Sequence, residues 1–316
     1  MLDLVTLGET CAALVAKSGG PLRHTVEFER RIGGAESTVA AGVARLGHRA
    51  GWISRLGADE LGAFILGVMR SENVDVKHVM MVEGEQTGVF LRENRSDGRS
   101  NVFYYRSTSA FTSFSPDDLD EGYIGSARFL HLGGITPGLS SSCLATVQRA
   151  MEIAKARDVK ITFDLNYRVK VWPPEDARAA LESLMTNADH VLAGREDLSK
   201  LTGISDQDAQ LDYLSGLGIS NIVLKWGSDG TIWAGPEGVL RVPSVTVTHP
   251  VDRFGVGDAF AAGYVGGLIQ GKNGPDAVDL GNRVAGWSLQ LPGNIESLPT
   301  RKELEGAQKT SELTRR

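Results

Sequence analysis

The segment Asp252-Arg253-Phe254-Gly255-Val256-Gly257-Asp258 has residues that could bind an anion and activate an alcohol. Gly255 and Gly257 let the backbone turn with its N–H groups on one side, and the helix expected from about Asp258 adds free N–H groups and the positive end of its dipole. Asp258 could then accept a proton from an alcohol whose oxygen attacks a phosphoryl group. The alternative is that Asp258 only caps the helix, a position where aspartate is favoured.

Signatures of several other enzyme classes are absent from the sequence. There is no G-x-x-x-x-G-K-[ST] loop, no G-x-G-x-x-G after the first expected strand, no G-x-S-x-G and no H-E-x-x-H, and the six histidines lack ligand spacing. Walker-type NTPases, Rossmann dehydrogenases, α/β-hydrolases and zinc proteases are therefore disfavoured.

Composition indicates an ordinary soluble globular chain. Its 316 residues include 33 Lys+Arg and 39 Asp+Glu, for a net charge of −6, with 41% hydrophobic and 23% charged residues. This balance offers no basic surface for nucleic acid, and two cysteines are too few for a disulfide framework. No secretory signal and no apolar run of about 20 residues is present, so we expect a cytoplasmic protein with no nucleic-acid or membrane partner.

The hydrophobic pattern alternates between strands and helices, which must place these residues. The expected strands are 4–7, 52–56, 129–132, 161–164, 190–193 and 222–225, and the expected helices include one from Gly34 to Gly47, then 60–72 (capped by Asp59), 142–157, 258–270 and 275–291, with a polar tail from Leu304. Such alternation predicts an α/β fold with a parallel sheet covered by helices on both faces, in one domain over residues 1–316.

Two β-rich segments, about 10–32 and 85–106, interrupt this alternation. The second reads as a hairpin with its turn at Ser96-Asp97-Gly98. Because loops at the carboxyl edge of a parallel sheet carry function, we expect both segments to form a small sheet over the site. The sheet could be a lid, an insertion without function, a dimer contact, or both lid and contact.

The sequence resembles the PfkB/ribokinase family of carbohydrate kinases through two motifs. These are Gly33-Gly34-Ala35-Glu36-Ser37-Thr38-Val39-Ala40-Ala41-Gly42 and the segment from Asp252 to Gly263, and the resemblance covers about residues 2–300. It implies a ribokinase-like three-layer α/β/α fold with a mostly parallel central sheet and a small β-sheet lid. It further implies phosphoryl transfer from ATP with Mg²⁺, allows a monovalent cation such as K⁺, and suggests a homo-oligomer formed through the lid.

The resemblance assigns roles to residues of the sugar side. Asp258 would be the catalytic base, and the backbone of Gly255, Val256 and Gly257 would form the anion hole. The substrate would contact Gly34, Ala35, Tyr104, Arg106 and Arg168.

The subgroup that phosphorylates 2-keto-3-deoxygluconate is suggested by Gly33-Gly34-Ala35-Glu36, by Tyr104-Tyr105-Arg106 and by Phe163-Asp164-Leu165-Asn166-Tyr167-Arg168. A planar arginine fork suits the carboxylate of such a sugar acid. Arg106 could instead be a solvated edge-strand residue, and Arg168 part of a structural ion pair. Ala13 stands where many relatives carry an acid for sugar hydroxyls, which also favours an anionic substrate.

On the nucleotide side, Lys225-Trp226-Gly227-Ser228-Asp229-Gly230 resembles the strand and turn that run beside ATP in the family. Lys225, Gly227, Ser228, Gly230 and Asn282 would bind the nucleotide. A plain turn, and a packing role for Asn282, are the alternatives.

Three positions depart from the family pattern, namely Thr38, Gly194 and Arg253. Thr38 weakens any role in sugar binding, and Arg253 could add a phosphate contact. Because Gly194 replaces an asparagine, we expect Glu196 or Asp197 to reach a metal only through water.

The expected activity is ATP-dependent phosphorylation of a primary hydroxyl, with 2-keto-3-deoxygluconate giving its 6-phosphate. The alternatives within the family are fructose, ribose, 5-keto-2-deoxygluconate or a nucleoside. The alternative outside enzymes is a non-catalytic sugar- or nucleotide-binding regulator.

Overall fold

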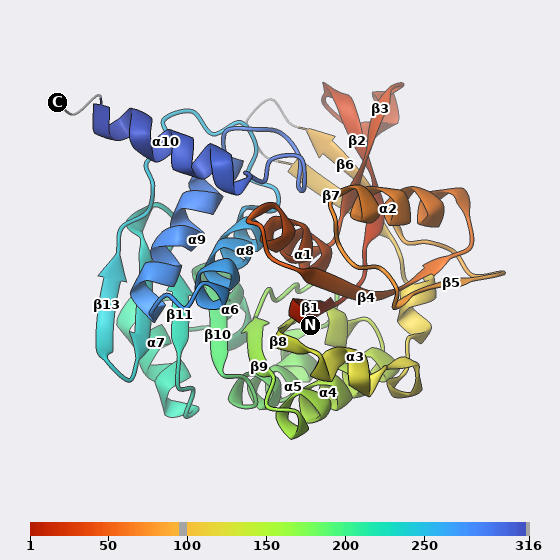
Figure 1. The fold of residues 1–316 in the computed structure, drawn as a ribbon. Helices are drawn as coiled ribbons and strands as arrows, with labels where there is room; N and C mark the ends of the chain where they lie inside the picture. The colour runs from red at the N-terminus through yellow and green to blue at the C-terminus, as the bar shows by residue number, and fades with distance from the viewer. Residues whose placement is uncertain (95–99, 314–316) are drawn as a thin grey trace.

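The computed structural model describes residues 1–94 and 100–313, and in them a nine-stranded sheet lies between two layers of helices (Figure 1). Its strand order is β13-β12-β11-β10-β9-β8-β1-β4-β5. The bounds are β1 Leu2–Leu7, β4 Ala50–Gly57, β5 Val79–Val82, β8 Ala127–Gly133, β9 Lys160–Asp164, β10 His190–Gly194, β11 Ile222–Lys225, β12 Thr231–Gly235 and β13 Gly238–Val242. The strands from β5 to β11 pair in parallel, and β12 pairs antiparallel with both β11 and β13.

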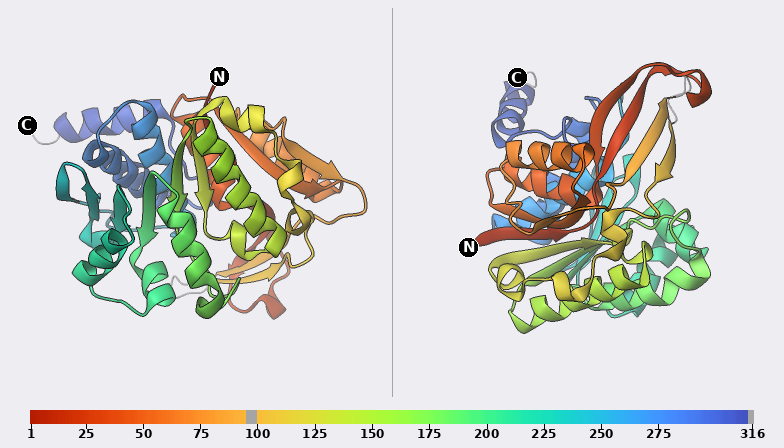
Figure 2. Two further views of the ribbon diagram at one scale, coloured as in Figure 1. Left: turned by 90° about the horizontal axis from the view of Figure 1, so that it is seen from below. Right: turned by 90° about the vertical axis from the view of Figure 1, so that its right-hand side faces the viewer.

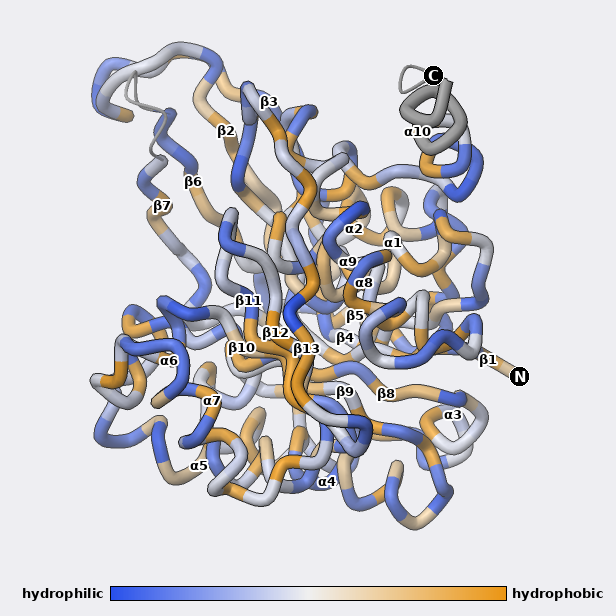
Figure 3. The backbone as a smooth tube through the Cα atoms, turned by 90° about the vertical axis from the view of Figure 1, so that its left-hand side faces the viewer, coloured by the Kyte–Doolittle hydropathy of each residue, from blue (hydrophilic) through white to orange (hydrophobic). Residues whose placement is uncertain are grey.

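The helices cover both faces of this sheet, which confirms the predicted three-layer α/β/α architecture. One layer contains α1 Ala35–Arg45, α2 Glu60–Ser71, α8 Val256–Ile269, α9 Gly274–Ser288 and α10 Arg301–Leu313. The other contains α3 Glu121–Gly125, α4 Ser141–Ala156, α5 Pro174–Thr186, α6 Arg195–Thr202 and α7 Gln207–Gly216. Each layer buries its own hydrophobic core against the sheet, and hydrophobic residues concentrate in the central strands (Figure 3).

Two local sequence signals predicted helix ends correctly. Gly47, just after α1, has a φ of +90°, the left-handed backbone that favours glycine. The Asp59 side chain accepts a hydrogen bond from the Gly62 N–H at 2.7 Å, so it caps α2 as predicted.

Four elements were not expected from the sequence pattern: the short strand β5, the antiparallel strands β12 and β13, and the helix α10. The helix predicted at residues 275–291 is present as α9, but it is not the last one, because the polar tail forms the further helix α10. Leu304, a residue of α10, is buried in the hydrophobic core of this helical layer. One apolar anchor in a polar segment is too weak a periodic signal to reveal a helix.

A second sheet, ordered β3-β2-β6-β7 among the described strands, projects from the carboxyl edge of the first (Figure 2). We call it the lid sheet; its strands are β2 Cys11–Gly19, β3 Phe28–Gly33, β6 Val89–Asn94 and β7 Ser100–Tyr105. It joins the two predicted β-rich segments through the parallel pairing of β2 with β6. The predicted turn at Ser96-Asp97-Gly98 lies outside the described residues.

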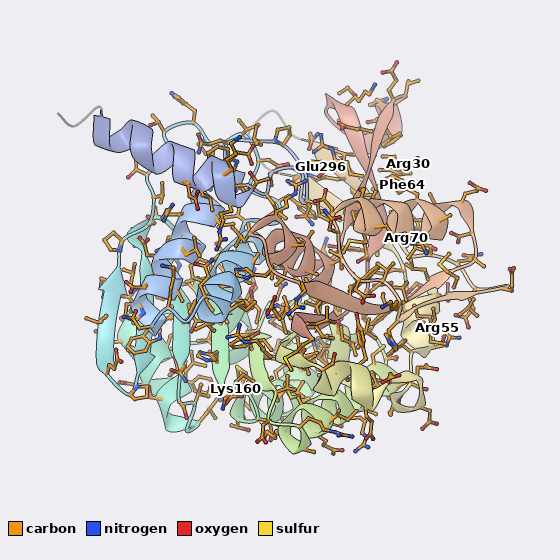
Figure 4. All side chains as sticks on the ribbon, viewed as in Figure 1. Arg30, Arg55, Phe64, Arg70, Lys160 and Glu296 are labelled. Carbon is orange, nitrogen blue, oxygen red and sulfur yellow. The ribbon has the colours of Figure 1, made fainter. Side chains whose placement is uncertain are left out.

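The lid sheet also contacts the helical layer. The guanidinium of Arg30 on β3 lies 3.9 Å from the centre of the Phe64 ring on α2 (Figure 4). Such a cation–π contact helps to fix the base of the sheet.

Candidate active site

A cavity of about 520 Å³ lies between the lid sheet and the carboxyl ends of the central strands. It includes every residue predicted for the sugar side and the anion hole. These predicted residues, all of which line the cavity, are Gly34, Ala35, Tyr104, Arg106, Arg168, Gly255, Val256, Gly257 and Asp258. The fold thus brings together residues that are scattered along the chain.

The amino end of α8 forms one wall of this cavity. Gly255 precedes the helix with a φ of +77°, and a Cβ there would lie 1.6 Å from Asn294 Oδ1, so only glycine fits. The first helical hydrogen bond runs from the Ala259 N–H to the Gly255 carbonyl at 2.8 Å. The preceding N–H groups of Val256, Gly257 and Asp258 donate to no backbone carbonyl of the described chain, which suits them to an anion.

Asp258 is the third residue of α8, because the helix begins at Val256 rather than near Asp258. It is therefore not the helix cap, and the capping alternative is wrong. Its carboxyl is partly open to the cavity, with Asn166 Nδ2 3.5 Å from its Oδ1. Desolvation by the surrounding cavity wall, reinforced by the negative charge of Asp164, raises the pKa of Asp258 to about 7 despite the opposing charges of Arg168 and Lys225. A carboxyl tuned in this way is suited to general base catalysis near neutral pH.

Arg106 is tied to an acid that sequence reasoning missed. Its Nε lies 3.2 Å from Oε2 of the buried Glu9, whose Oε1 accepts a 2.5 Å hydrogen bond from Ser109. The Nη2 of Arg106 is buried without a hydrogen-bond partner among the described residues. One guanidinium edge is thus held in place while this nitrogen remains able to donate.

Glu9 also corrects the interpretation of Ala13. Ala13 is buried in the lid sheet with Cys11 and Phe90, away from the cavity lining. The first strand region therefore does supply an acid to the cavity, from Glu9. A single glutamate after a short strand is too common a pattern to have indicated this.

Arg168 is half exposed at the cavity, with Nη1 3.4 Å from Asp197 Oδ1. This long contact leaves most of its N–H groups available to a ligand. Tyr104 lies beside Arg106, whose guanidinium is 5.0 Å from the ring centre. Tyr104, Arg106 and Arg168 converge on one cavity as the sequence predicted.

Asp164 at the end of β9 and Lys225 at the end of β11 form a further pair across the end of β10, with 2.6 Å between Nζ and Oδ2. The other oxygen of Asp164, Oδ1, is buried without a hydrogen-bond partner in the described structure. The sequence did not indicate this ion pair, because Asp164 and Lys225 are 61 residues apart along the chain.

The two candidate acids of α6 separate in the structure. Asp197 lines the cavity, and burial raises the pKa of its carboxyl although Arg168 opposes the shift. Glu196 is largely exposed and pairs with Lys200 at 3.6 Å, so the prediction that it approaches a metal is not supported by its position. Among the described residues, no three His, Cys, Asp or Glu side chains gather closely enough to hold a metal unaided.

A second cavity, of about 530 Å³, continues from the first. Lys225, Arg253, Val256 and Gly257 line both cavities, so the two meet at the amino end of α8. The predicted residues Gly227, Ser228 and Asn282 line the second cavity, whereas Gly230 lines neither. Gly230 instead turns the chain into β12 with a φ of +100°.

Asn282 has a structural function in addition to lining the cavity. It accepts a hydrogen bond from Thr231 Oγ1 at 3.1 Å and donates one to the Pro243 carbonyl at 3.0 Å. Apolar side chains, among them Val245, Phe260 and Leu289, provide the remaining wall, which suits a flat heterocyclic ring.

The three departures from the family pattern have different positions. Gly194 and Arg253 line the first cavity. Thr38 is buried beneath it, donating to the Gly34 carbonyl at 2.6 Å and accepting from Asn294 Nδ2 at 3.0 Å. Thr38 thus supports the loop rather than facing a ligand.

No helix of the described chain is both long enough and apolar enough to cross a membrane.

Comparison with known proteins relates this geometry to a family. The sequence profile described as "pfkB family carbohydrate kinase" matches residues 1–301. The 2-dehydro-3-deoxygluconokinase of Bacillus subtilis (strain 168) is 35% identical over 307 residues, covering 96% of this chain and 94% of its own. That of Thermoproteus tenax is 34% identical with the same coverage, and the 5-dehydro-2-deoxygluconokinase of B. subtilis is 29% identical, also over 96% and 94%.

Solved structures agree with the fold. The PfkB protein from Polaromonas sp. JS666 superposes with a TM-score of 0.88 at 36% identity, over 96% of this chain and 99% of that one. A putative ribokinase II from E. coli, solved in complex with ATP and Mg²⁺, gives a TM-score of 0.90 at 21% identity, over 98% and 100%.

Proposed function

The chain belongs to the PfkB family of carbohydrate kinases, and from that premise we propose that it transfers the γ-phosphoryl group of ATP to the primary hydroxyl of 2-keto-3-deoxygluconate, giving the 6-phosphate. Its class, a phosphotransferase acting on carbohydrates, follows from the family. The identity of the sugar is our proposal.

One observation supports this reaction above all: the two cavities meet at the amino end of α8. A nucleotide in the second cavity would direct its phosphates toward the N–H groups of Val256 and Gly257. A sugar in the first cavity would present its hydroxyl to Asp258. In-line transfer needs this arrangement of donor, acceptor and base.

The protein groups would act as follows. Asp258 takes the proton from the hydroxyl as its oxygen attacks, and the α8 N–H groups stabilise the negative charge that develops on the phosphoryl oxygens. Lys225, held by Asp164, adds a positive charge where the cavities join. The lid sheet excludes water, which would otherwise compete with the sugar.

The residues present also fit Mg²⁺ bound together with ATP. Asp197 lines the cavity and Asp164 has an oxygen without a hydrogen-bond partner, so these carboxylates could hold metal-bound water. The metal would supply charge neutralisation on the phosphates. A K⁺ requirement remains a prediction, tested by replacing K⁺ with Na⁺ in the assay.

An acidic sugar is favoured by the cationic side chains that line the first cavity. Arg168 and the buried Nη2 of Arg106 offer donors to a carboxylate, and the Tyr104 hydroxyl lies on the same wall. The 5-dehydro-2-deoxygluconokinase relatives make 5-keto-2-deoxygluconate the second candidate, since it is also a keto-deoxy acid.

We also propose self-association through the lid sheet. Phe103 and Tyr105, on its edge strand β7, are 44% and 67% exposed. Aromatic residues at an open strand edge suit a protein interface. Sedimentation of wild type and of Tyr105→Ser tests this: a monomeric wild type would refute it.

The experiment that tests the function is ADP release with ATP and Mg²⁺ across a panel of sugars. The panel contains 2-keto-3-deoxygluconate, its galacto epimer, 5-keto-2-deoxygluconate, fructose, ribose and adenosine, with Asp258→Asn as the blank. Turnover of 2-keto-3-deoxygluconate above the others supports the proposal. Preference for a neutral sugar or nucleoside would overturn the substrate assignment, and nucleotide binding without turnover of any member would favour a regulatory protein.

A further inference from the structure

Glu36, the second residue of α1, is a buried acid in the sugar cavity that the proposed reaction does not use. It is 2% exposed and lines the cavity beside Gly34 and Ala35. The first sequence motif contains it, but no role followed from the resemblance.

Two glycines make the space that its carboxyl occupies. A Cβ at Gly8, just after β1, would lie 2.2 Å from Glu36 Oε2, and one at Gly133, the end of β8, would lie 2.7 Å from Oε1. The Gly8 carbonyl is itself fixed by hydrogen bonds from Trp52 Nε1 at 3.0 Å and Ser54 Oγ at 2.8 Å. The carboxyl therefore sits in a rigid recess at the centre of the sheet's carboxyl edge.

Among the described residues, no lysine, arginine or histidine forms an ion pair with Glu36; Arg106 pairs with Glu9 instead, and its charge only opposes the rise in the pKa of Glu36. Thr136 Oγ1 donates a 3.2 Å hydrogen bond to Oε1. Burial, with the nearby charge of Asp258 adding to it, raises the pKa of Glu36 to about 8. At neutral pH the group is accordingly a carboxylic acid, which can both donate and accept a hydrogen bond.

We infer that Glu36 is a specificity-determining residue that hydrogen-bonds a secondary hydroxyl of the sugar-acid chain. In the proposed function, on which this inference rests, Asp258 receives the primary hydroxyl and the arginines hold the carboxylate. The hydroxyls between these ends need partners inside the cavity, and Glu36 is a group there that can donate and accept at once. A buried polar group built to bind a hydroxyl also rejects analogues that lack it.

The test compares kcat/KM for the sugar acid with kcat/KM for analogues that lack the C4 or the C5 hydroxyl. Wild type should prefer the intact sugar over one of these analogues by about 10–100-fold, and Glu36→Leu should reduce that ratio to near one. KM for ATP should stay unchanged. Glu93→Gln is the matched control, because Glu93 is a buried glutamate, bonded to Asn101 and to the Leu22 N–H, that lines neither cavity.

Failure of this inference is distinguishable from failure of the proposed function. If wild type phosphorylates a different sugar, the comparison is made with deoxy analogues of that sugar. An unchanged ratio in an active, folded Glu36→Leu would overturn the inference and leave the function standing.

If Glu36→Leu does not fold, the variant Glu36→Gln provides a second test of the inference. Glutamine keeps a donor and an acceptor but cannot ionise. Wild-type kcat/KM should decline above about pH 8 as Glu36 loses its proton, and the decline should be absent in Glu36→Gln. Identical alkaline profiles would contradict the assignment.

Discussion

Arg92 on the lid strand β6 binds Asp252 at the head of the glycine loop through two hydrogen bonds, of 2.8 Å from Nη1 and 2.7 Å from Nη2. Asp252 also accepts from the N–H groups of Phe254 at 3.0 Å and Gly293 at 3.2 Å. Burial alone would raise the pKa of Asp252, but these bonds, the Arg92 bond first among them, hold it below its usual value. The pair thus joins the lid sheet to the loop before α8, whose N–H groups we propose to bind the phosphates.

Arg92→Met should destabilise the protein by about 3–5 kcal/mol, because it leaves the Asp252 charge buried and unpaired. It should also lower kcat as the loop loses its support. Urea unfolding and steady-state kinetics measure the two effects. The double variant Arg92→Met/Asp252→Asn should recover much of the stability; a double variant as unstable as the single one would contradict this explanation.

Asp258→Asn should lower kcat by about 10²–10⁴-fold, because the amide cannot accept the proton of the attacking hydroxyl. Sugar binding, measured by calorimetry, should change far less. Near-normal turnover would eliminate Asp258 as the base.

The pH dependence of kcat/KM should show an acid limb. Asp258 acts as a base only when ionised, and its pKa is raised to about 7. Activity should therefore fall as the pH drops through about 7, and a profile flat from pH 5 to 8 would argue against this tuning.

The stability of the folded protein should also depend on the ionisation of Asp258, but it should fall with rising pH where the activity rises. Since the folded state holds the pKa of Asp258 above its ordinary value, its contribution to stability is present at acid pH and lost as the pH rises toward 7. Asp258→Asn should thus raise the Tm relative to wild type at pH 8, with a difference that shrinks toward pH 4. Thermal melts of both proteins at pH 4 and pH 8 test this prediction. A Tm difference between variant and wild type that is the same at both pH values would refute it.

Arg168→Ala should weaken binding of an acidic sugar by about 1.5–3 kcal/mol, the contribution of a charge-assisted hydrogen bond. Its contact with Asp197 is long, so little stability should be lost. Arg178→Ala is a control of the same type, because Arg178 is a half-exposed arginine paired with Glu182 outside both cavities. An unchanged Kd for the acid would remove Arg168 from the substrate site.

Features that depend on neighbouring residues were predictable from the sequence. Gly255 and Gly257 predicted a turn into an alanine-rich helix, and Asp59 and Gly47 predicted helix ends, because capping and left-handed backbone are decided within a few residues. The alternation of strands and helices likewise predicted the parallel sheet and its two helical layers. The family resemblance added the roles that we propose for Asp258 and the arginines.

Tertiary structure alone decided which charges meet. Glu9 pairs with Arg106, and Asp164 pairs with Lys225, which is 61 residues further along the chain. The fold also brings Thr136 to Glu36, 100 residues away in the sequence, as a hydrogen-bond donor. It also placed Asp197 in the cavity and Glu196 outside it, though they are adjacent in sequence. The physical reason is that burial and charge pairing depend on distances in space, which set the pKa of Asp258 and Glu36, whereas sequence patterns report only the local backbone.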